Sequence, residues 1–444
     1  MTLTIANAAL IVERFDDEIR DRTGDLTIGA DGRVTPTASP ETADEVLDAE
    51  GAIVTPGLVN AHHHLLQSGF RTLPGTRGVP MREWLPAMAA AYAAARIDAS
   101  LVAATASVGL AESLLCGVTT VADHQLNWPD PAASADPVGD TVAIARAIAE
   151  AAAALGARLV FVRGSARDAP EAAAASADAI ARDLLAAGHT GGITPGGMLQ
   201  LAVGPAGVHS DSEETFRALG EVARAHGLRR RTQANEQVDT EIALDRYGRR
   251  PLDLLEEWGW LEPGVTIAHL CDVTGDEIAR LAAAGITATH APGCDVPMGW
   301  GIAPVRRLRE AGIAVGLGTS GGGSNDAGHL LADARLAMQV SGLVGQSLAA
   351  RDVLTMATSA GGAGLGRSDL GILTPGALGD ACVWDVSGVA DAGVADPVAG
   401  LLWANPGRRP RHVVVAGRVV VRDYRLVTGD EPALVSALRA RVGR

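Results

Sequence analysis

Short apolar runs rich in β-branched residues alternate with longer amphipathic or alanine-rich stretches from residue 53 to about residue 340. The short runs have the length of buried strands, and the stretches between them have the length of helices. Eight strands are predicted, at residues 53–59, 119–122, 159–163, 199–203, 228–232, 265–268, 285–289 and 313–317. Eight strand–helix repeats are typical of a closed (β/α)8 barrel. An open Rossmann-type sheet is the alternative architecture, but no G-x-G-x-x-G motif follows the first predicted strand.

The two ends of the chain have a different pattern, in which short strands alternate with turns. Residues 25–29, 381–385 and 412–421 are examples. Two strand-rich ends that flank a barrel can pair into one satellite domain. The sequence therefore predicts an α/β protein with a barrel domain over residues 53–372 and a small β-rich domain built from residues 1–52 and 373–444.

The composition and net charge of the chain limit the kinds of molecule that it is expected to bind. Hydrophobic residues make up 47% of the 444 residues, so the chain can bury a large core. The 37 basic and 52 acidic residues give a net charge of −15, which argues against a nucleic-acid or anionic membrane partner. No apolar stretch reaches the roughly 18–20 residues of a membrane span, and no basic segment precedes an apolar one at the N-terminus. Four widely spaced cysteines without a C-x-x-C motif indicate a reduced, cytoplasmic protein.

Polar side chains gather where the predicted strands end, which is where the active site of a (β/α)8 barrel forms. The first strand is followed by His62 and His64, an H-x-H pair whose side chains point the same way in an extended chain and can share one metal ion. The later strands are followed by Gln233 and Glu236, by His269, by His290, and by Ser320 with Asn325 and Asp326. The sequence therefore predicts a catalytic or metal-binding centre at this end of the barrel.

These motifs resemble those of the amidohydrolase superfamily, in its branch of cytosine-deaminase-like aminohydrolases and chlorohydrolases. The resemblance is carried by residues 55–64, 117–124, 268–269, 298–304, 316–320 and 379–381. The chain is most similar to triazine hydrolases and then to 8-oxoguanine deaminases. The resemblance implies a distorted (β/α)8 TIM barrel, a small β-sandwich formed by both chain ends, and assembly into a homodimer or a larger homo-oligomer.

The resemblance also implies a mononuclear Zn²⁺ site. By position, His62 and His64 are metal ligands, Glu236 is the acid–base residue of the H-x-x-E motif, and His269 contacts the hydrolytic water or the leaving group. Gln233 and Ser320 depart from the pattern, because they stand where a third His ligand and an Asp ligand are expected. An amide oxygen is a weaker zinc ligand than an imidazole. Zn²⁺ is therefore expected on His62 and His64, with help from Gln233 or His269.

The implied reaction is hydrolysis of a C–N or C–halogen bond in an amino-substituted N-heterocycle of the triazine, purine or pteridine type. Activated water attacks the ring carbon while Glu236 moves its proton, and His269 and Ser320 are the other catalytic candidates. The residues expected to hold the ring are Gln67, Trp84, His290, Asn325 and Asp326. For the last two, the alternative role is capping of a helix that begins near residue 327.

Two other functions stay open. A metal-independent enzyme on the same scaffold could use His62, His64, Glu236 and His269 as acids and bases for a hydrolysis, cyclisation or elimination. A non-catalytic binding protein could keep the pocket alone. The presence of all four groups argues against the binding protein, because binding a ring does not need four proton-transfer or metal-binding residues.

Overall fold

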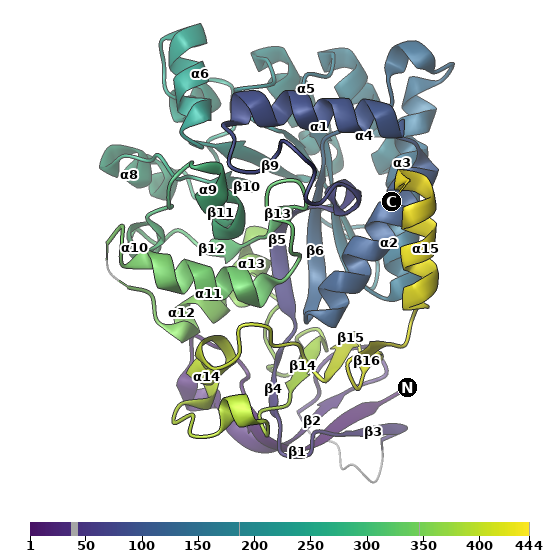
Figure 1. Cartoon of the computed structure of the whole chain (residues 1–444), viewed down its shortest axis with the longest axis vertical. Helices are drawn as coiled ribbons and strands as arrows, with labels where there is room; N and C mark the ends of the chain where they lie inside the picture. Colours follow the sequence, from purple (N-terminus) through teal and green to yellow (C-terminus); the bar gives the residue numbers. More distant parts are fainter. Residues whose placement is uncertain (37–42, 186, 346, 444) are drawn as a thin grey trace.

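A parallel sheet of nine strands forms the centre of the computed structural model, which describes residues 1–36, 43–185, 187–345 and 347–443 (Figure 1). Its strands, in order across the sheet, are β12 (Val315–Leu317), β11 (Thr287–His290), β10 (Val265–His269), β9 (Arg229–Ala234), β8 (Leu199–Pro205), β7 (Arg158–Ser165), β6 (Val118–Gln125), β5 (Leu58–His64) and β13 (Ser320–Gly321). β12 pairs with β11, and β13, which follows it closely in the chain, pairs with β5 at the other edge. One segment of chain thus joins both edges of the sheet, and the predicted distorted barrel is confirmed.

Helices follow the barrel strands and surround the barrel and its upper end (Figure 1). They are α2 (Ala99–Leu115), α3 (Pro137–Leu155), α4 (Pro170–Leu184), α5 (Glu213–His226), α6 (Val238–Tyr247), α7 (Pro251–Glu257), α8 (Gly275–Ala283), α9 (Pro292–Met298), α10 (Val305–Glu310), α11 (Leu330–Ser341), α12 (Ala350–Met356) and α13 (Ser359–Gly364). In α5, Phe216, Leu219 and Ala223 are spaced to share one face, and all three are buried. Gly227 ends this helix in the left-handed conformation, with a φ of 64°.

The two chain ends build a second sheet of eight strands. These are β1 (Leu3–Ile11), β2 (Arg22–Ile28), β3 (Glu45–Asp48), β4 (Ile53–Pro56), β14 (Ala381–Trp384), β15 (His412–Val415), β16 (Arg418–Arg422) and β17 (Arg425–Leu426). β4 pairs with both β1 and β14, so it joins the N-terminal strands to the C-terminal ones. The predicted pairing of the two ends is confirmed, whereas the division into domains at residues 52/53 and 372/373 stays a prediction.

The strand predicted at residues 53–59 is two strands, broken at Gly57. A Cβ at Gly57 would lie 2.3 Å from Oγ1 of Thr119, so only glycine permits this close approach of the backbone to β6. β4 therefore belongs to the second sheet, and the first barrel strand is β5. The H-x-H pair lies inside β5 and not after its end.

A buried ion pair connects the barrel to the second sheet. Arg158, at the start of β7, donates from Nε and Nη2 to the two carboxylate oxygens of Asp380, at 2.6 and 2.9 Å. Asp380 directly precedes β14, and its Oδ1 also accepts a hydrogen bond from the backbone N of Ala416 at 2.8 Å. Both charged side chains are almost fully buried. Because the contact is bidentate, it fixes the orientation of the two groups as well as their separation.

The insert after β5 contains the 3-10 helix η3 (Leu65–Gly69) and α1 (Met81–Ala95), and α1 lies across the end of the barrel away from the second sheet (Figure 1). The remaining helices are α14 (Pro397–Trp403), α15 (Glu431–Val442), η1 (Glu18–Arg20), η4 (Pro131–Ala133) and η5 (Val389–Asp391). Within the described residues, no single helix is long and apolar enough to cross a membrane. α1 and α2 reach that length and hydropathy only as a pair, which is bent by 118°.

Candidate active site

β5 presents two imidazoles to the interior of the barrel end. His62 and His64 are separated by one residue of an extended strand, and their ring centroids lie 4.9 Å apart. Nδ1 of His64 donates to the carbonyl oxygen of His124 at 2.7 Å, which leaves the lone pair on Nε2. Nε2 of His62 is buried and has no hydrogen-bond partner within the described part of the chain. The H-x-H pair therefore offers two nitrogen atoms that form no hydrogen bond with another described residue.

His269, at the end of β10, brings a third imidazole to this pair. Its ring centroid lies 5.3 Å from that of His62. Its Nδ1 lies 2.6 Å from Oδ1 of Asp295, while its Nε2 lies 3.0 Å from Oε1 of Gln233 and 3.6 Å from Oε1 of Glu236. An ionised carboxylate can only accept a hydrogen bond, so Nδ1 of His269 donates to Asp295. Nε2 is consequently the nitrogen that faces the other site residues.

Gln233 directs its carbonyl oxygen towards His269. Its Nε2 donates to the carbonyl oxygen of Ala206 at 3.1 Å, so Oε1 is the atom beside Nε2 of His269. In a neutral His269 that carries its proton on Nδ1, both of these neighbouring atoms are acceptors. Two buried acceptors at 3.0 Å need a proton or a cation to hold them together. The arrangement therefore fits either a doubly protonated His269 or a metal ion that both residues contact.

Glu236 and Ser320 complete the set of predicted catalytic residues. Glu236 lies between β9 and α6, is 1% exposed, and has no hydrogen-bond partner for either carboxylate oxygen within the described residues. Ser320 lies in β13 opposite His63, with a φ of 55°. A buried carboxylate without a hydrogen bond is unusual and calls for an explanation such as a ligand or a catalytic role.

Burial and charge set the protonation states of these groups. Burial lowers the pKa of His62 well below its usual range and the pKa of His64 to about 4, so both are neutral at pH 7. Burial raises the pKa of Glu236. Burial also opposes the ionised form of Asp295, but the neighbouring His269 outweighs it and lowers the pKa of Asp295 to about 2. In the same way, Asp295 and Glu236 outweigh the burial of His269 and raise its pKa. The site thus combines neutral imidazole ligands, a proton acceptor of raised pKa and an ionised carboxylate.

Three of the residues predicted to hold a ring gather around the loop that follows β13. Oε1 of Gln67 accepts a hydrogen bond from the backbone N of Gly323, and Nε1 of Trp84 donates to the carbonyl oxygen of Gly323, both at 3.0 Å. Asp326 forms an ion pair with Arg77. The insert after β5 and the loop after β13 are therefore tied together, and contact of these side chains with a substrate stays a prediction.

Asn325 holds the same loop against α11. Its Nδ2 donates to Oδ2 of Asp333 and to the carbonyl oxygen of Thr319, both at 3.0 Å. α11 begins at Leu330, and its N-cap residue is His329, whose side chain accepts from the backbone of the first turn. The alternative in which Asn325 and Asp326 cap this helix is therefore wrong.

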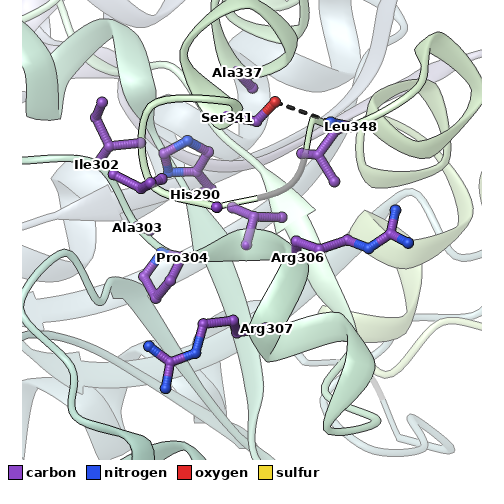
Figure 2. A pocket seen from close by; sticks show the side chains of 12 residues that line it. His290, Ile302, Ala303, Pro304, Arg306, Arg307, Ala337, Ser341 and Leu348 are labelled. Carbon is purple, nitrogen blue, oxygen red and sulfur yellow. Dashed lines mark hydrogen bonds between the residues drawn. The ribbon is translucent and has the colours of Figure 1, made fainter.

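His290, at the end of β11, faces both the site and a small cavity. Its Nδ1 lies 3.6 Å from Oδ2 of Asp295. Its ring also lines a cavity of about 10 Å³, the space of roughly one water molecule, where Arg306 and Arg307 extend away from it (Figure 2). This cavity is too small for a heterocycle. The role of His290 in substrate binding stays a prediction, and a substrate could reach its ring only from the side that faces Asp295.

Asp295 is the main site residue that the strand-end pattern did not indicate. It lies on α9, in the segment that follows β11, and is 0% exposed. Possible metal-binding atoms of His269, Cys294 and Asp295 all lie within 4.8 Å of one another. The ring of Trp300 stands edge-on to His269 at 5.2 Å. The only signal in the sequence was an acidic residue shortly after the seventh strand, in the same kind of position as Glu236 after the fifth.

The sequence profile of the amidohydrolase family matches residues 53–420, and the chain belongs to this family. The match covers the whole barrel and most of the C-terminal part of the second sheet. The resemblance inferred from the H-x-H segment and the later motifs is therefore confirmed at the level of the family.

Particular relatives agree with the deaminase and chlorohydrolase branch. The 8-oxoguanine deaminase of Pseudomonas aeruginosa is 33% identical over 406 residues, which cover 88% of this chain and 87% of that protein. A 5-methylthioadenosine/S-adenosylhomocysteine deaminase of Natronomonas pharaonis is 31% identical over 422 residues, which cover 94% and 93%. The structure of an atrazine chlorohydrolase from Arthrobacter aurescens in complex with zinc has a TM-score of 0.89 at 31% identity, over 99% of this chain and 100% of that one.

Proposed function

We propose that the protein is a metal-dependent hydrolase that removes an amino or halide group from an electron-poor carbon of an N-heterocycle. The observation that carries this proposal is the buried cluster of His62, His64, Glu236 and His269, in which Nε2 of His62 and both oxygens of Glu236 lack a hydrogen-bond partner among the described residues. Unsatisfied buried groups of this kind are expected where a metal ion and a substrate complete the site. The activities named for the relatives, on a purine, an adenosine derivative and a triazine, support the substrate class.

The chemistry of His62 and His64 suits a Zn²⁺ ion. His62 and His64 are neutral, and the hydrogen bond of His64 to a backbone carbonyl is the usual support of a metal-ligating histidine. We assign the role of third metal ligand to His269 or Gln233. Nε2 of His269 and Oε1 of Gln233 are 3.0 Å apart. When bound, such an ion supplies Lewis-acid chemistry that acidifies water and stabilises developing negative charge.

Glu236 is the proton carrier in this proposal. Its raised pKa suits it to accept a proton from the attacking water and to return it to the leaving group. His269 lies 3.6 Å from Glu236, so the two can act on the same water or leaving group. Ser320 contributes a hydroxyl at the position where other members of the family carry an Asp. Gln67, Trp84, Asn325, Asp326 and His290 are proposed to shape the ring pocket, four of them by positioning the loop after β13.

The test is release of ammonia or halide from a panel that contains 8-oxoguanine, 5′-methylthioadenosine, isoxanthopterin and atrazine, with protein loaded with zinc. We expect turnover of at least one compound, and Glu236→Gln should lower kcat by about 10²–10⁴-fold. Glu221→Gln, on the exposed face of α5, is the matched control. Full activity in metal-free protein would favour the metal-independent enzyme, and tight ring binding without turnover would favour the binding protein.

We also propose that the protein is cytoplasmic and forms a homodimer or a larger homo-oligomer. The four cysteines are free, which agrees with a reducing compartment. Light scattering on purified protein tests the oligomeric state, and a monomer at micromolar concentration would contradict it.

A further inference from the structure

Four of the residues expected at the candidate metal position carry no charge. His62 and His64 are neutral at pH 7, and Gln233 and Ser320 carry no charge. A divalent ion in such a setting lacks the compensating negative charge that a carboxylate ligand provides. Asp295 is a buried carboxylate one hydrogen bond away, because its Oδ1 lies 2.6 Å from Nδ1 of His269.

We propose that Asp295 is a positioning residue of the metal site, which fixes His269 with its proton on Nδ1 and supplies the buried negative charge that Gln233 and Ser320 do not supply. The inference rests on the proposed metal-dependent function. It extends that function to a residue that lies on α9 and not at the end of a strand.

The hydrogen bond determines which nitrogen of His269 the site receives. Since the carboxylate of Asp295 only accepts, Nδ1 of His269 must donate, and Nε2 is left to face Gln233 and Glu236. A carboxylate behind a ligating histidine raises the basicity of the ligand and holds the ring in place. The ring of Trp300, edge-on to His269 at 5.2 Å, restricts the same imidazole from another direction.

Among the described residues, only histidines form ion pairs with the carboxylate of Asp295. Asp295 is 0% exposed, and within the described residues its carboxylate forms ion pairs only with His269, at 2.6 Å, and His290, at 3.6 Å. No Arg or Lys of this part of the chain pairs with it. A fully buried carboxylate that stays ionised needs positive charge or hydrogen bonds to compensate its loss of hydration. An imidazolium or a metal ion on the other side of His269 is therefore the compensating charge, and screening by solvent is weak in so buried a place.

Asp295→Asn separates charge from shape, because an Asn oxygen can still accept from Nδ1 of His269 while the negative charge is removed. Zinc affinity, measured without substrate by competition with a chromophoric chelator, should fall by about 10–100-fold. The matched control is Asp333→Asn, since the Asp333 carboxylate is also buried but accepts hydrogen bonds from Gly293 N and Asn325 Nδ2, and within the described residues it pairs with no histidine side chain. The control should keep the zinc affinity of the parent protein.

A second measurement uses the parent protein, so it does not depend on whether a variant folds. In zinc-loaded parent protein with ¹⁵N-labelled histidine, His269 should show a proton on Nδ1 and none on Nε2. A proton on Nε2, or an Asp295→Asn variant that binds zinc as tightly as the parent, overturns the inference. If the Asp295→Asn variant turns over substrate and its zinc affinity is unchanged, the inference about Asp295 is overturned but the proposed hydrolase function is not. A parent protein that turns over substrate without binding zinc would overturn the metal-dependent function itself.

Discussion

Replacing Gln233 with histidine tests how far this residue limits metal binding. Gln233 is 7% exposed at the end of β9, and its Oε1 lies 3.0 Å from Nε2 of His269. Imidazole is a stronger zinc ligand than an amide oxygen. Supporting residues alone are worth about 10–100-fold in metal affinity, so Gln233→His should tighten zinc binding by at least about 10–100-fold, or about 1.4–2.7 kcal/mol.

The cost of the substitution falls on folding and not on zinc affinity. It removes the hydrogen bond from Nε2 of Gln233 to the carbonyl oxygen of Ala206, which is worth about 1 kcal/mol. The same carbonyl also accepts from the backbone N of residue 233 at 3.2 Å, so it keeps a partner. Because the side-chain bond is lost with and without metal, it lowers the stability of both states alike.

Zinc affinity by chelator competition, with the free energy of unfolding measured on metal-free protein, distinguishes the two effects. Gln200→His is the matched control, since Gln200 is a buried glutamine at the start of β8 whose Nε2 donates to the carbonyl oxygen of Leu365 at 2.9 Å. It should lose stability without gaining zinc affinity. A folded Gln233→His variant that binds zinc no more tightly than the parent would refute the placement of Gln233 beside the metal.

Three further predictions concern the frame of the site. Asp380→Ala leaves Arg158 buried without its carboxylate, so urea denaturation should show a loss of about 3–5 kcal/mol, and a loss below about 1 kcal/mol, the size of a surface pair, would contradict this. Burial raises the pKa of Asp333 to about 7, so its stabilising contribution is present below pH 4 and is lost as the pH rises through 7. Asp333→Asn should therefore abolish a fall of about 3 kcal/mol in the free energy of unfolding between pH 4 and 7, and identical pH profiles would count against it. Arg77→Ala breaks the ion pair with Asp326 and should raise KM several-fold with kcat nearly unchanged in steady-state kinetics, whereas an equal loss in kcat would assign Arg77 to the chemistry.

The barrel could be predicted because its strands are short, apolar and regularly spaced. This pattern in the sequence does not depend on which side chains contact one another. Seven of the eight predicted barrel strands overlap the observed ones closely, from β6 at Val118–Gln125 to β12 at Val315–Leu317. The first was displaced because the strand-like residues 53–59 span Gly57, where the close approach to Thr119 divides the chain into β4 and β5. A contact between distant strands leaves no mark in the local pattern.

The site was predictable to the extent that its residues lie at the ends of strands. His62 and His64 share a face because side chains alternate along β5, and His269 ends β10. Asp295 is different, because the chain first turns into α9 and only then returns a carboxylate to His269. An aspartate on a short helix looks the same in the sequence whether it caps the helix, faces solvent or supports a ligand.

This difference bears on how a barrel can keep a metal site after its ligands change. The carboxyl ends of all eight strands converge on one centre, so a charge absent after one strand can be supplied from the segment after another without moving the metal. In the proposed site, the position after the eighth strand holds the uncharged Ser320, while Asp295, after the seventh, holds a carboxylate beside Nδ1 of His269. If His269 holds a metal ion as proposed, this arrangement would place the negative charge behind a ligand instead of on the metal, and the bound ion would then be a stronger Lewis acid.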